Sequence, residues 1–164
     1  MIRIVAAALG GAAVAYLASP ALNLPMLAYW NTSPSVPLGA WLWSSKWPPE
    51  RGDVVAMRDP PMWPHDVLLK RVEGVAGDRF CWSEQEGRHY INQRPMTVLS
   101  PLAYDLEALV PEFSIWRGCR VLKPGEIAGF GEGSLSHGSA YLGPVWIDDL
   151  HGVYWRLEMT ITGG

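Results

Sequence analysis

The sequence predicts a mainly β domain, built as a partly closed barrel, that follows an apolar N-terminal helix. Three observations support this prediction. The 14 Pro and 17 Gly are spread along the chain, which favours many short strands and turns over long helices. Residues 4–18 form one continuous run of apolar residues, Ala and Gly, with no polar residue at helical spacing. The 164 residues suffice for about one domain and one additional segment.

Strands are expected where short apolar runs end at turn residues. The first candidate is Gly52–Met57, which Asp59–Pro61 ends. A short helix is expected over Leu102–Leu109, within the less regular stretch Leu99–Trp116. The remaining candidate strands, in chain order, are Val67–Val75, His89–Met96, Glu126–Glu132, Pro144–Ile147 and Gly152–Leu157.

The beginning of the chain carries almost no charge. No charged residue follows Arg3 until Lys46, and Pro20 and Pro25 limit any helix in between. A full membrane span needs about 20 apolar residues, so the run over residues 4–18 is of marginal length. Three interpretations of this run remain open: a membrane anchor, a cleaved signal peptide and a buried helix. A signal peptide would end near the small residues Ala18, Ser19 and Ala21.

The first two interpretations both export the rest of the chain. Arg3 and the N-terminal amine would then stay on the cytoplasmic side. We therefore expect a membrane anchor or signal segment over residues 1–22 and a folded domain over residues 23–164. The predicted location is the inner membrane with the domain in the periplasm, or the periplasm alone if the segment is cleaved.

The two cysteines lie in separate segments of the chain. Cys81 and Cys119 form no Cys-x-x-Cys motif, and no histidine stands at zinc-ligand spacing from them. In an oxidising compartment they could form one disulfide, and the alternative is two buried free thiols. We expect the disulfide, because the domain is predicted to be exported.

The overall charge excludes one class of partner. A formal net charge of −3 gives no electrostatic footprint for nucleic acid, so no nucleic-acid partner is expected. No metal-binding motif is recognisable, and the sequence implies no cofactor.

A serine and a lysine are the strongest candidates for chemistry. Ser35 lies between two prolines, and Lys70 lies within an apolar run that ends at a Gly-Asp turn. A serine is a weak nucleophile until a base removes its proton, and a desolvated lysine can be that base. If the two side chains meet, the protein is a serine hydrolase with a lysine in place of the usual histidine.

The strand around Lys70 gives this interpretation a physical basis. Side chains alternate between the two faces of a strand, so Lys70 shares a face with Leu68 and Val72. A lysine among apolar neighbours loses hydration, and its pKa falls from about 10.4 toward the range useful for a general base. A surface lysine on an edge strand remains the alternative.

These segments resemble the type I signal peptidase superfamily (family S26), the membrane-bound Ser-Lys peptidases. Within it they are most similar to the TraF-like pilin-processing peptidases of conjugation systems. That branch carries Asn-x-Ser/Thr-x-Ser-x-Pro-x-Gly around its nucleophile. This motif is matched in full by Asn31, Ser33, Ser35, Pro37 and Gly39.

Two further motifs follow in the order of the family. The motif Lys-Arg-x-x-Gly-x-x-Gly-Asp, which contains the base, is matched by Lys70, Arg71, Gly74, Gly77 and Asp78. The motif Ser-x-Asp-Ser-Arg-Tyr-x-Gly-Pro-Val is matched in part by Ser136, Ser139, Tyr141, Gly143, Pro144 and Val145.

The resemblance implies a β-rich Ser-Lys peptidase that cleaves exported precursors, in this branch a prepilin, after small residues. Ser35 would be the nucleophile and Lys70 the general base. The Ser35 amide and the Ser33 hydroxyl would form the oxyanion hole, and Ser136 would orient the lysine amine. The implied partners are the membrane and an exported precursor or prepilin.

The third motif also departs from the family pattern. Gly138 and Ala140 stand where the family has Asp and Arg. These substitutions leave the proposed dyad in place, but they put in doubt how the segment around Ser136 is held and whether pilin cyclisation occurs. They also motivate two alternatives, a general type I signal peptidase and a catalytically degenerate envelope scaffold.

A Ser-His-Asp hydrolase is the main enzymatic rival. The sequence offers four histidines but no Gly-x-Ser-x-Gly elbow, and a histidine in such a chain is usually structural. They are His65, His89, His137 and His151.

Overall fold

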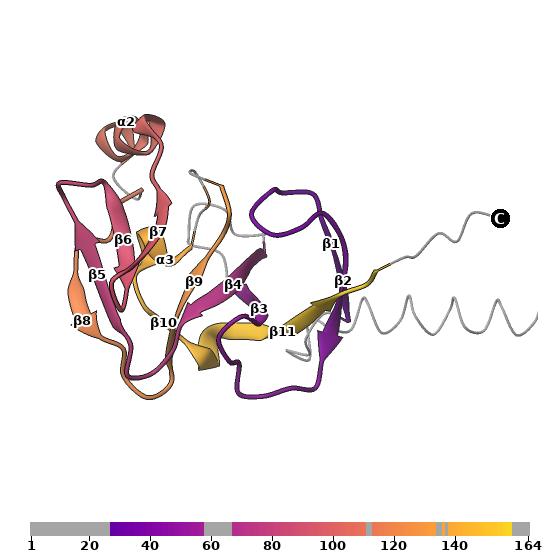
Figure 1. Cartoon of the computed structure of the whole chain (residues 1–164). Coiled ribbons are helices and arrows are strands. Elements are labelled where there is room, and N and C mark those ends of the chain that lie inside the picture. Colours follow the sequence, from indigo (N-terminus) through magenta and orange to yellow (C-terminus); the bar gives the residue numbers. More distant parts are fainter. Residues whose placement is uncertain (1–26, 58–66, 111–112, 134–135, 137, 159–164) are drawn as a thin grey trace, which may run out of the picture.

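The described part of the chain forms two antiparallel sheets with short helices beside the smaller one (Figure 1). The structure is a computed structural model, and it describes residues 27–57, 67–110, 113–133, 136 and 138–158. The predicted N-terminal segment, residues 1–22, and the predicted turn Asp59–Pro61 lie outside these ranges. Among the residues described, no helix has the length and apolar character needed to cross a membrane.

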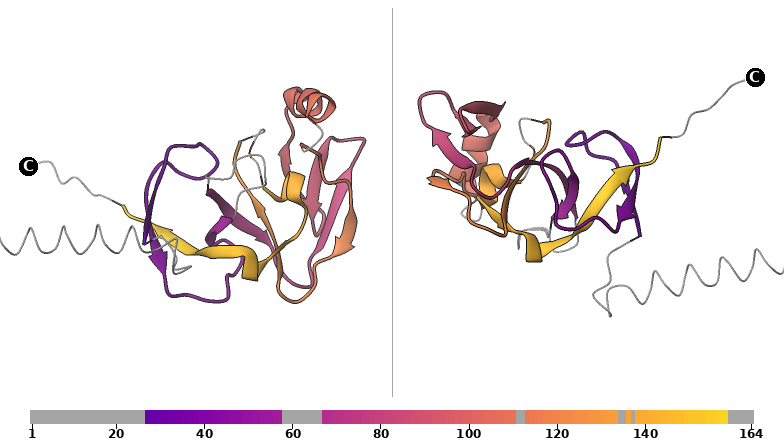
Figure 2. Two further views of the ribbon diagram at one scale, coloured as in Figure 1. Left: turned by 180° about the vertical axis from the view of Figure 1, so that it is seen from behind. Right: turned by 60° about the horizontal axis from the view of Figure 1, so that its bottom comes forward.

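The larger sheet curls into a half-barrel, as the two further views also show (Figures 1 and 2). Its strand order is β1-β2-β11-β3-β4-β9-β10. The β3–β4–β9 segment forms the middle of this sheet, with β4 paired on both sides. The bounds of its strands are β1 Ala28–Asn31, β2 Gly39–Ser44, β3 Val54–Met57, β4 Leu68–Gly74, β9 Glu126–Phe130, β10 Val145–Trp146 and β11 Leu150–Arg156.

The smaller sheet has the order β7-β6-β5-β8. Two α-helices and a 3-10 turn accompany the sheets in the described ranges. Helix α2 begins with Pro101 at its first turn, and the Ser100 hydroxyl caps it by accepting from the Leu102 N–H. The bounds are β5 Arg79–Ser83, β6 Arg88–Ile91, β7 Arg94–Val98, β8 Cys119–Val121, α2 Pro101–Leu109, α3 Ser139–Leu142 and the 3-10 turn Ile147–Asp149.

The prediction of a mainly β domain is confirmed, and the curled larger sheet corresponds to the predicted partly closed barrel. Five of the six expected strands coincide with observed strands or hairpins, and Leu102–Leu109 lies within α2. His89–Met96 folds as the β6–β7 hairpin, turned at two residues with positive φ, Asn92 and Gln93. The expected strand Pro144–Ile147 is reduced to the two residues of β10, because a 3-10 turn follows at once.

Three apolar clusters form the core of the described structure, and the first of them joins the two sheets. One cluster fills the space between the smaller sheet, α2, α3 and the end of β9, and includes the fully buried Phe80. The other two contain residues of β3, β4 and β11, with Leu69 in one and Val72 in the other. Leu69 and Val72 are three residues apart and therefore point to opposite faces of β4. Because they belong to different clusters, both faces of this strand are covered by apolar side chains.

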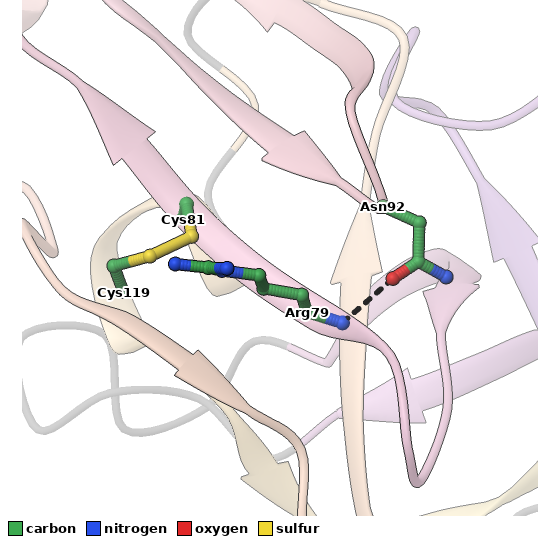
Figure 3. The surroundings of a disulfide bond; sticks show 4 residues. All are labelled: Arg79, Cys81, Asn92 and Cys119. Atoms are coloured by element: carbon green, nitrogen blue, oxygen red, sulfur yellow. Dashed lines mark hydrogen bonds between the residues drawn. A yellow bond between two sulfur atoms is a disulfide. The ribbon is translucent and has the colours of Figure 1, made fainter.

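A disulfide joins β5 to β8 in the smaller sheet. Cys81 and Cys119 are directly opposite each other in the antiparallel pairing, and their sulfur atoms are bonded (Figure 3). Beside them, the Arg79 N–H donates to Asn92 Oδ1 at 2.8 Å and ties β5 to the turn of the β6–β7 hairpin.

Removing this disulfide is expected to destabilise the domain without changing its chemistry. The cysteines are 38 residues apart, and closing a loop of that size stabilises the folded state by about 3–4 kcal/mol in the chain-entropy model. We expect the double variant Cys81→Ser, Cys119→Ser to lose about this amount in the free energy of unfolding, measured by urea denaturation. An unchanged denaturation midpoint would show that the bond does not stabilise the fold.

Candidate active site

The loop between β1 and β2 carries Ser33 and Ser35. The pairing of β1 with β2 ends at Asn31 and Gly39, so the loop between these two residues forms no strand pairing of its own. A residue outside the loop supports it: the N–H of Glu132, in the segment that follows β9, donates to the Ser35 carbonyl oxygen at 2.9 Å. The Trp41 indole N–H also donates to the Pro37 carbonyl oxygen at 3.0 Å.

Inside this loop the two serine hydroxyls are joined. The Ser33 hydroxyl donates to Ser35 Oγ at 2.9 Å, and Ser33 Oγ accepts from the Ser35 N–H at 3.2 Å. The Ser35 hydroxyl donates to the Leu69 carbonyl oxygen at 3.4 Å. That carbonyl belongs to β4, so Ser35 contacts the strand one residue before Lys70. Ser35 is 5% exposed, and its hydroxyl is therefore largely shielded from water.

Lys70 is buried in the middle of the larger sheet. It is 2% exposed and lies opposite Val55 of β3, a fully buried residue. Burial in this apolar setting lowers the pKa of Lys70 to about 8. About half of the amine is therefore neutral near pH 8, and the neutral fraction, which a general base requires, grows as the pH rises further.

Two glycines make room for the Lys70 side chain. A Cβ atom at Gly129 of β9 would lie 2.9 Å from Met57 Sδ and 3.2 Å from Lys70 Cβ. A Cβ atom at Gly138 would lie 2.7 Å from the Gly129 carbonyl oxygen and 3.3 Å from Lys70 Cδ. The alkyl chain of Lys70 therefore runs between β9 and the segment that leads into α3.

Ser35 and Ser136 meet at a third glycine. A Cβ atom at Gly131 would overlap Ser136 Oγ and lie 2.7 Å from Ser35 Cβ. Ser136 Oγ is buried and has no hydrogen-bond partner among the described residues. Ser35, Lys70 and Ser136, from three separate motifs, thus lie around residues 129–131, which are the last two residues of β9 and the one that follows it.

The departures from the family pattern have a local structural explanation. An aspartate at position 138 would collide with the backbone of β9 unless β9 or Lys70 moved, whereas glycine fits. Ala140 is 3% exposed and packs in the core cluster beneath the smaller sheet. The Ser139 hydroxyl, which accepts from the Gly129 N–H at 2.8 Å, attaches this segment to β9.

Asp78, from the motif that contains Lys70, supports the turns around β4. Its carboxylate accepts from the Val75 N–H at 2.7 Å, from the Arg51 guanidinium at 2.5 Å and from the Asn92 amide at 2.6 Å. Burial raises the pKa of Asp78, but these hydrogen bonds outweigh it, and the net pKa is lowered. The carboxylate therefore stays charged and joins three loops at the end of β4.

Asn31, Asp78, Gly131 and Glu132 are residues of the site to which the sequence analysis assigned no role. Asn31 and Asp78 were visible as members of the motifs, but a motif does not state which neighbours a side chain will bond. Glu132 contributes through its backbone N–H, and Gly131 through its lack of a side chain. Neither contribution could have been predicted from a sequence motif.

The histidines that the structure describes have other surroundings. His89 is fully buried in the smaller sheet, and its Nε2 lies 2.8 Å from the Trp116 carbonyl oxygen. Burial lowers the pKa of His89 to about 4, so the ring is neutral at physiological pH. His151 lies on β11, while His65 and His137 fall outside the described residues. Within the described ranges, no three His, Cys, Asp or Glu side chains cluster in a way that could hold a metal ion.

A pocket of about 160 Å³ opens beside the end of β9. Its floor includes Phe130 and Met96, which are nearly buried, and its wall includes Gly131 and Glu132, the residues next to Ser35. Charged side chains form the rim, where Arg94 pairs with Glu73 at 2.5 Å.

Comparison with known proteins places the chain in a family. A family model described as signal peptidase, peptidase S26, matches residues 1–156. Among solved structures, a signal peptidase I from Enterococcus faecalis aligns with 20% sequence identity and a TM-score of 0.41, over 66% of this chain and 98% of that one. A comparison with curated proteins gives no match.

The chain belongs to the signal peptidase family, peptidase S26. It is therefore a serine peptidase, and its substrates are exported precursor proteins.

Replacing Lys70 by methionine is expected to stabilise the fold at neutral pH. The folded-state pKa of about 8 lies below the usual 10.5, so the folded chain loses stability as the pH falls through this window. The variant avoids this loss, and its advantage is about 3 kcal/mol at pH 7 and vanishes near about pH 11. Urea denaturation at several pH values measures the difference. A difference that does not change with pH would contradict a buried, titrating amine.

Proposed function

We propose that this serine peptidase uses a Ser35–Lys70 dyad to cleave exported precursors after small residues. Ser35 acts as the nucleophile and Lys70 as the general base. The contacts at Gly131 and Gly138 support this proposal most directly, because they gather Ser35, Lys70 and Ser136 around one short segment of β9. The lowered pKa of Lys70 supports the role of its amine as a base at working pH.

In the proposed acylation step, Ser35 Oγ attacks the carbonyl carbon of the residue before the scissile bond while the Lys70 amine takes the hydroxyl proton. For this the Ser35 hydroxyl turns from the Leu69 carbonyl oxygen toward the amine. The Lys70 ammonium then donates the proton to the leaving amine, and an acyl-enzyme remains. In deacylation the neutral Lys70 amine takes a proton from water, which attacks the ester carbonyl carbon. As the bond to Ser35 Oγ breaks, the ammonium returns the proton to this oxygen, and the acid product, the free hydroxyl and the neutral amine result.

The oxyanion hole of this proposal consists of the Ser35 N–H and the Ser33 hydroxyl. In the substrate-free arrangement these two groups bond to each other, and Ser33 also donates to Ser35 Oγ. Rotation of the Ser33 hydroxyl redirects its proton to the developing oxyanion and frees the Ser35 N–H. Each such donor contributes about 10²–10³-fold to kcat in comparable sites. The buried, unpartnered hydroxyl of Ser136 is available to accept from the Lys70 amine and orient it.

Single substitutions test the dyad. We expect Ser35→Ala and Lys70→Ala each to abolish precursor processing while the circular dichroism spectrum stays that of the folded domain. In the wild type, kcat/KM is expected to rise as the pH passes through about 8, because only the neutral amine accepts the proton.

Exposed residues of the same types provide matched controls. Ser45→Ala and Lys123→Ala alter exposed side chains and are expected to retain full processing. Processing at the wild-type rate by either Ser35→Ala or Lys70→Ala would reject the dyad.

We further propose that the preferred substrate is a prepilin of a conjugation system, and that the domain acts in the periplasm beside the inner membrane, held by residues 1–22. The complete nucleophile motif from Asn31 to Gly39 supports this narrower assignment. The expected kcat/KM for a prepilin is at least about 10-fold above that for an unrelated secretory precursor. Equal values for the two purified precursors would favour a general type I signal peptidase.

A further inference from the structure

We propose that Asn31 is the positioning residue of the nucleophile: its carboxamide sets the conformation of the loop that aims the Ser35 hydroxyl and N–H. This inference rests on the proposed role of Ser35 as the nucleophile. It concerns a residue that does not itself touch Ser35 and that lies at the end of β1, before the loop begins.

The carboxamide of Asn31 binds four backbone groups of the loop. Its Nδ2 donates to the carbonyl oxygens of Ser33 at 2.7 Å, Val36 at 2.8 Å and Pro37 at 3.2 Å. Its Oδ1 accepts from the Ser33 N–H at 3.2 Å. Asn31 is 9% exposed, so these bonds form where water competes poorly for the same groups.

These bonds bracket Ser35 on both sides along the chain. Ser33 is fixed through both its N–H and its carbonyl oxygen, and Val36 is fixed through its carbonyl oxygen. The backbone of Ser35 lies between these fixed points. Its own carbonyl oxygen is held from outside by the Glu132 N–H. With the backbone fixed on either side, the direction of the Ser35 N–H and Cα–Cβ bonds is fixed as well.

Only an asparagine meets the requirements of this position. One end of the side chain faces three acceptors and must be a donor, while the other faces an N–H and must be an acceptor. Aspartate has the same shape but places a second acceptor against three carbonyl oxygens. Serine and alanine are too short to reach them.

A second side chain that supports this loop, that of Trp41, acts differently. The Trp41 indole N–H donates to the Pro37 carbonyl oxygen, two residues beyond Ser35 and on one side of it only. Loss of this bond should loosen the attachment of the loop to β2 without turning Ser35. Trp41→Phe therefore separates general support of the loop from positioning of the nucleophile.

The test compares Asn31→Asp with two matched controls, Trp41→Phe and Thr32→Ala, in the full chain in detergent. Thr32 is exposed and is the first residue of the loop, directly after Asn31. Processing of a precursor peptide with a small residue before the scissile bond gives kcat and KM. Urea denaturation of each protein gives the free energy of unfolding.

We expect Asn31→Asp to lower kcat about 100-fold, the effect of displacing a reacting group by about 1 Å, and to change KM less than about threefold. The pH at which kcat/KM rises should stay near about 8, since Lys70 is unchanged. Trp41→Phe and Thr32→Ala should each lower kcat by less than about threefold, even where Trp41→Phe destabilises the fold as much as Asn31→Asp.

Three outcomes would overturn the inference, two of them in the activity measurements and one in folding. The first is a kcat for Asn31→Asp within about threefold of the wild type. The second is a loss of kcat that follows the free energy of unfolding equally in Asn31→Asp and Trp41→Phe. If Asn31→Asp does not fold, Asn31→Ser gives the same comparison without a new charge. Failure of both variants to fold would also overturn it, because Asn31 would then belong to the fold alone.

The inference can fail independently of the dyad. Full processing by Ser35→Ala would reject the nucleophile and with it this role of Asn31. Inactive Ser35→Ala together with fully active Asn31→Asp would leave the dyad intact and reject only the positioning role.

Discussion

The burial of one amine, that of Lys70, is the constraint on which the rest of the site depends. A charged ammonium loses its hydration in the middle of an apolar sheet, so burial shifts the protonation equilibrium toward the neutral amine and lowers the pKa to about 8. No carboxylate is required to tune this group, because desolvation alone lowers its pKa. Two features of the fold bury Lys70. Strand β4 is paired with a strand on each side, and Gly129 and Gly138 leave room for the alkyl chain of Lys70.

The two proposed catalytic groups are held by different means. Lys70 is fixed by a central strand, whereas Ser35 lies on a loop that would be mobile without side-chain support. The loop is fixed from within by Asn31 and from without by the Glu132 N–H of the segment that follows β9. Strand β9 also pairs with β4, which carries Lys70. The end of β9 and the segment after it therefore fix where Ser35 lies relative to Lys70.

The sequence predicted the strands whose apolar runs end at clear turns, and it placed Lys70 on the same face as Leu68 and Val72. It did not predict β1 and β2, because the Trp- and Pro-rich sequence around them alternates over too few residues to show a period of two. The strands β5 and β8 were missed for a similar reason: both are short, β5 begins with Arg79, and β8 has Arg120 in its middle.

Contacts between distant segments lie beyond such patterns. Gly131 brings Ser35 and Ser136 together only because β9 lies beside β4, a pairing between residues far apart in the chain. Gly138 looked like the loss of a family aspartate, but in the fold it is the residue that fits against β9 and Lys70. The proposed role of Asn31 likewise depends on where the backbone carbonyl groups of the loop point. No local sequence pattern predicts these directions.

The most direct test of this account is a titration of the Lys70 amine itself, in protein labelled with ¹³C at lysine Cε and observed by NMR, with Lys70→Met to assign the signal. The account predicts a Cε shift that titrates with a midpoint of about 8 in the folded domain and returns to the ordinary lysine range on unfolding. A midpoint near 10.5 in the folded domain would contradict it, because the amine would then be charged and hydrated at working pH.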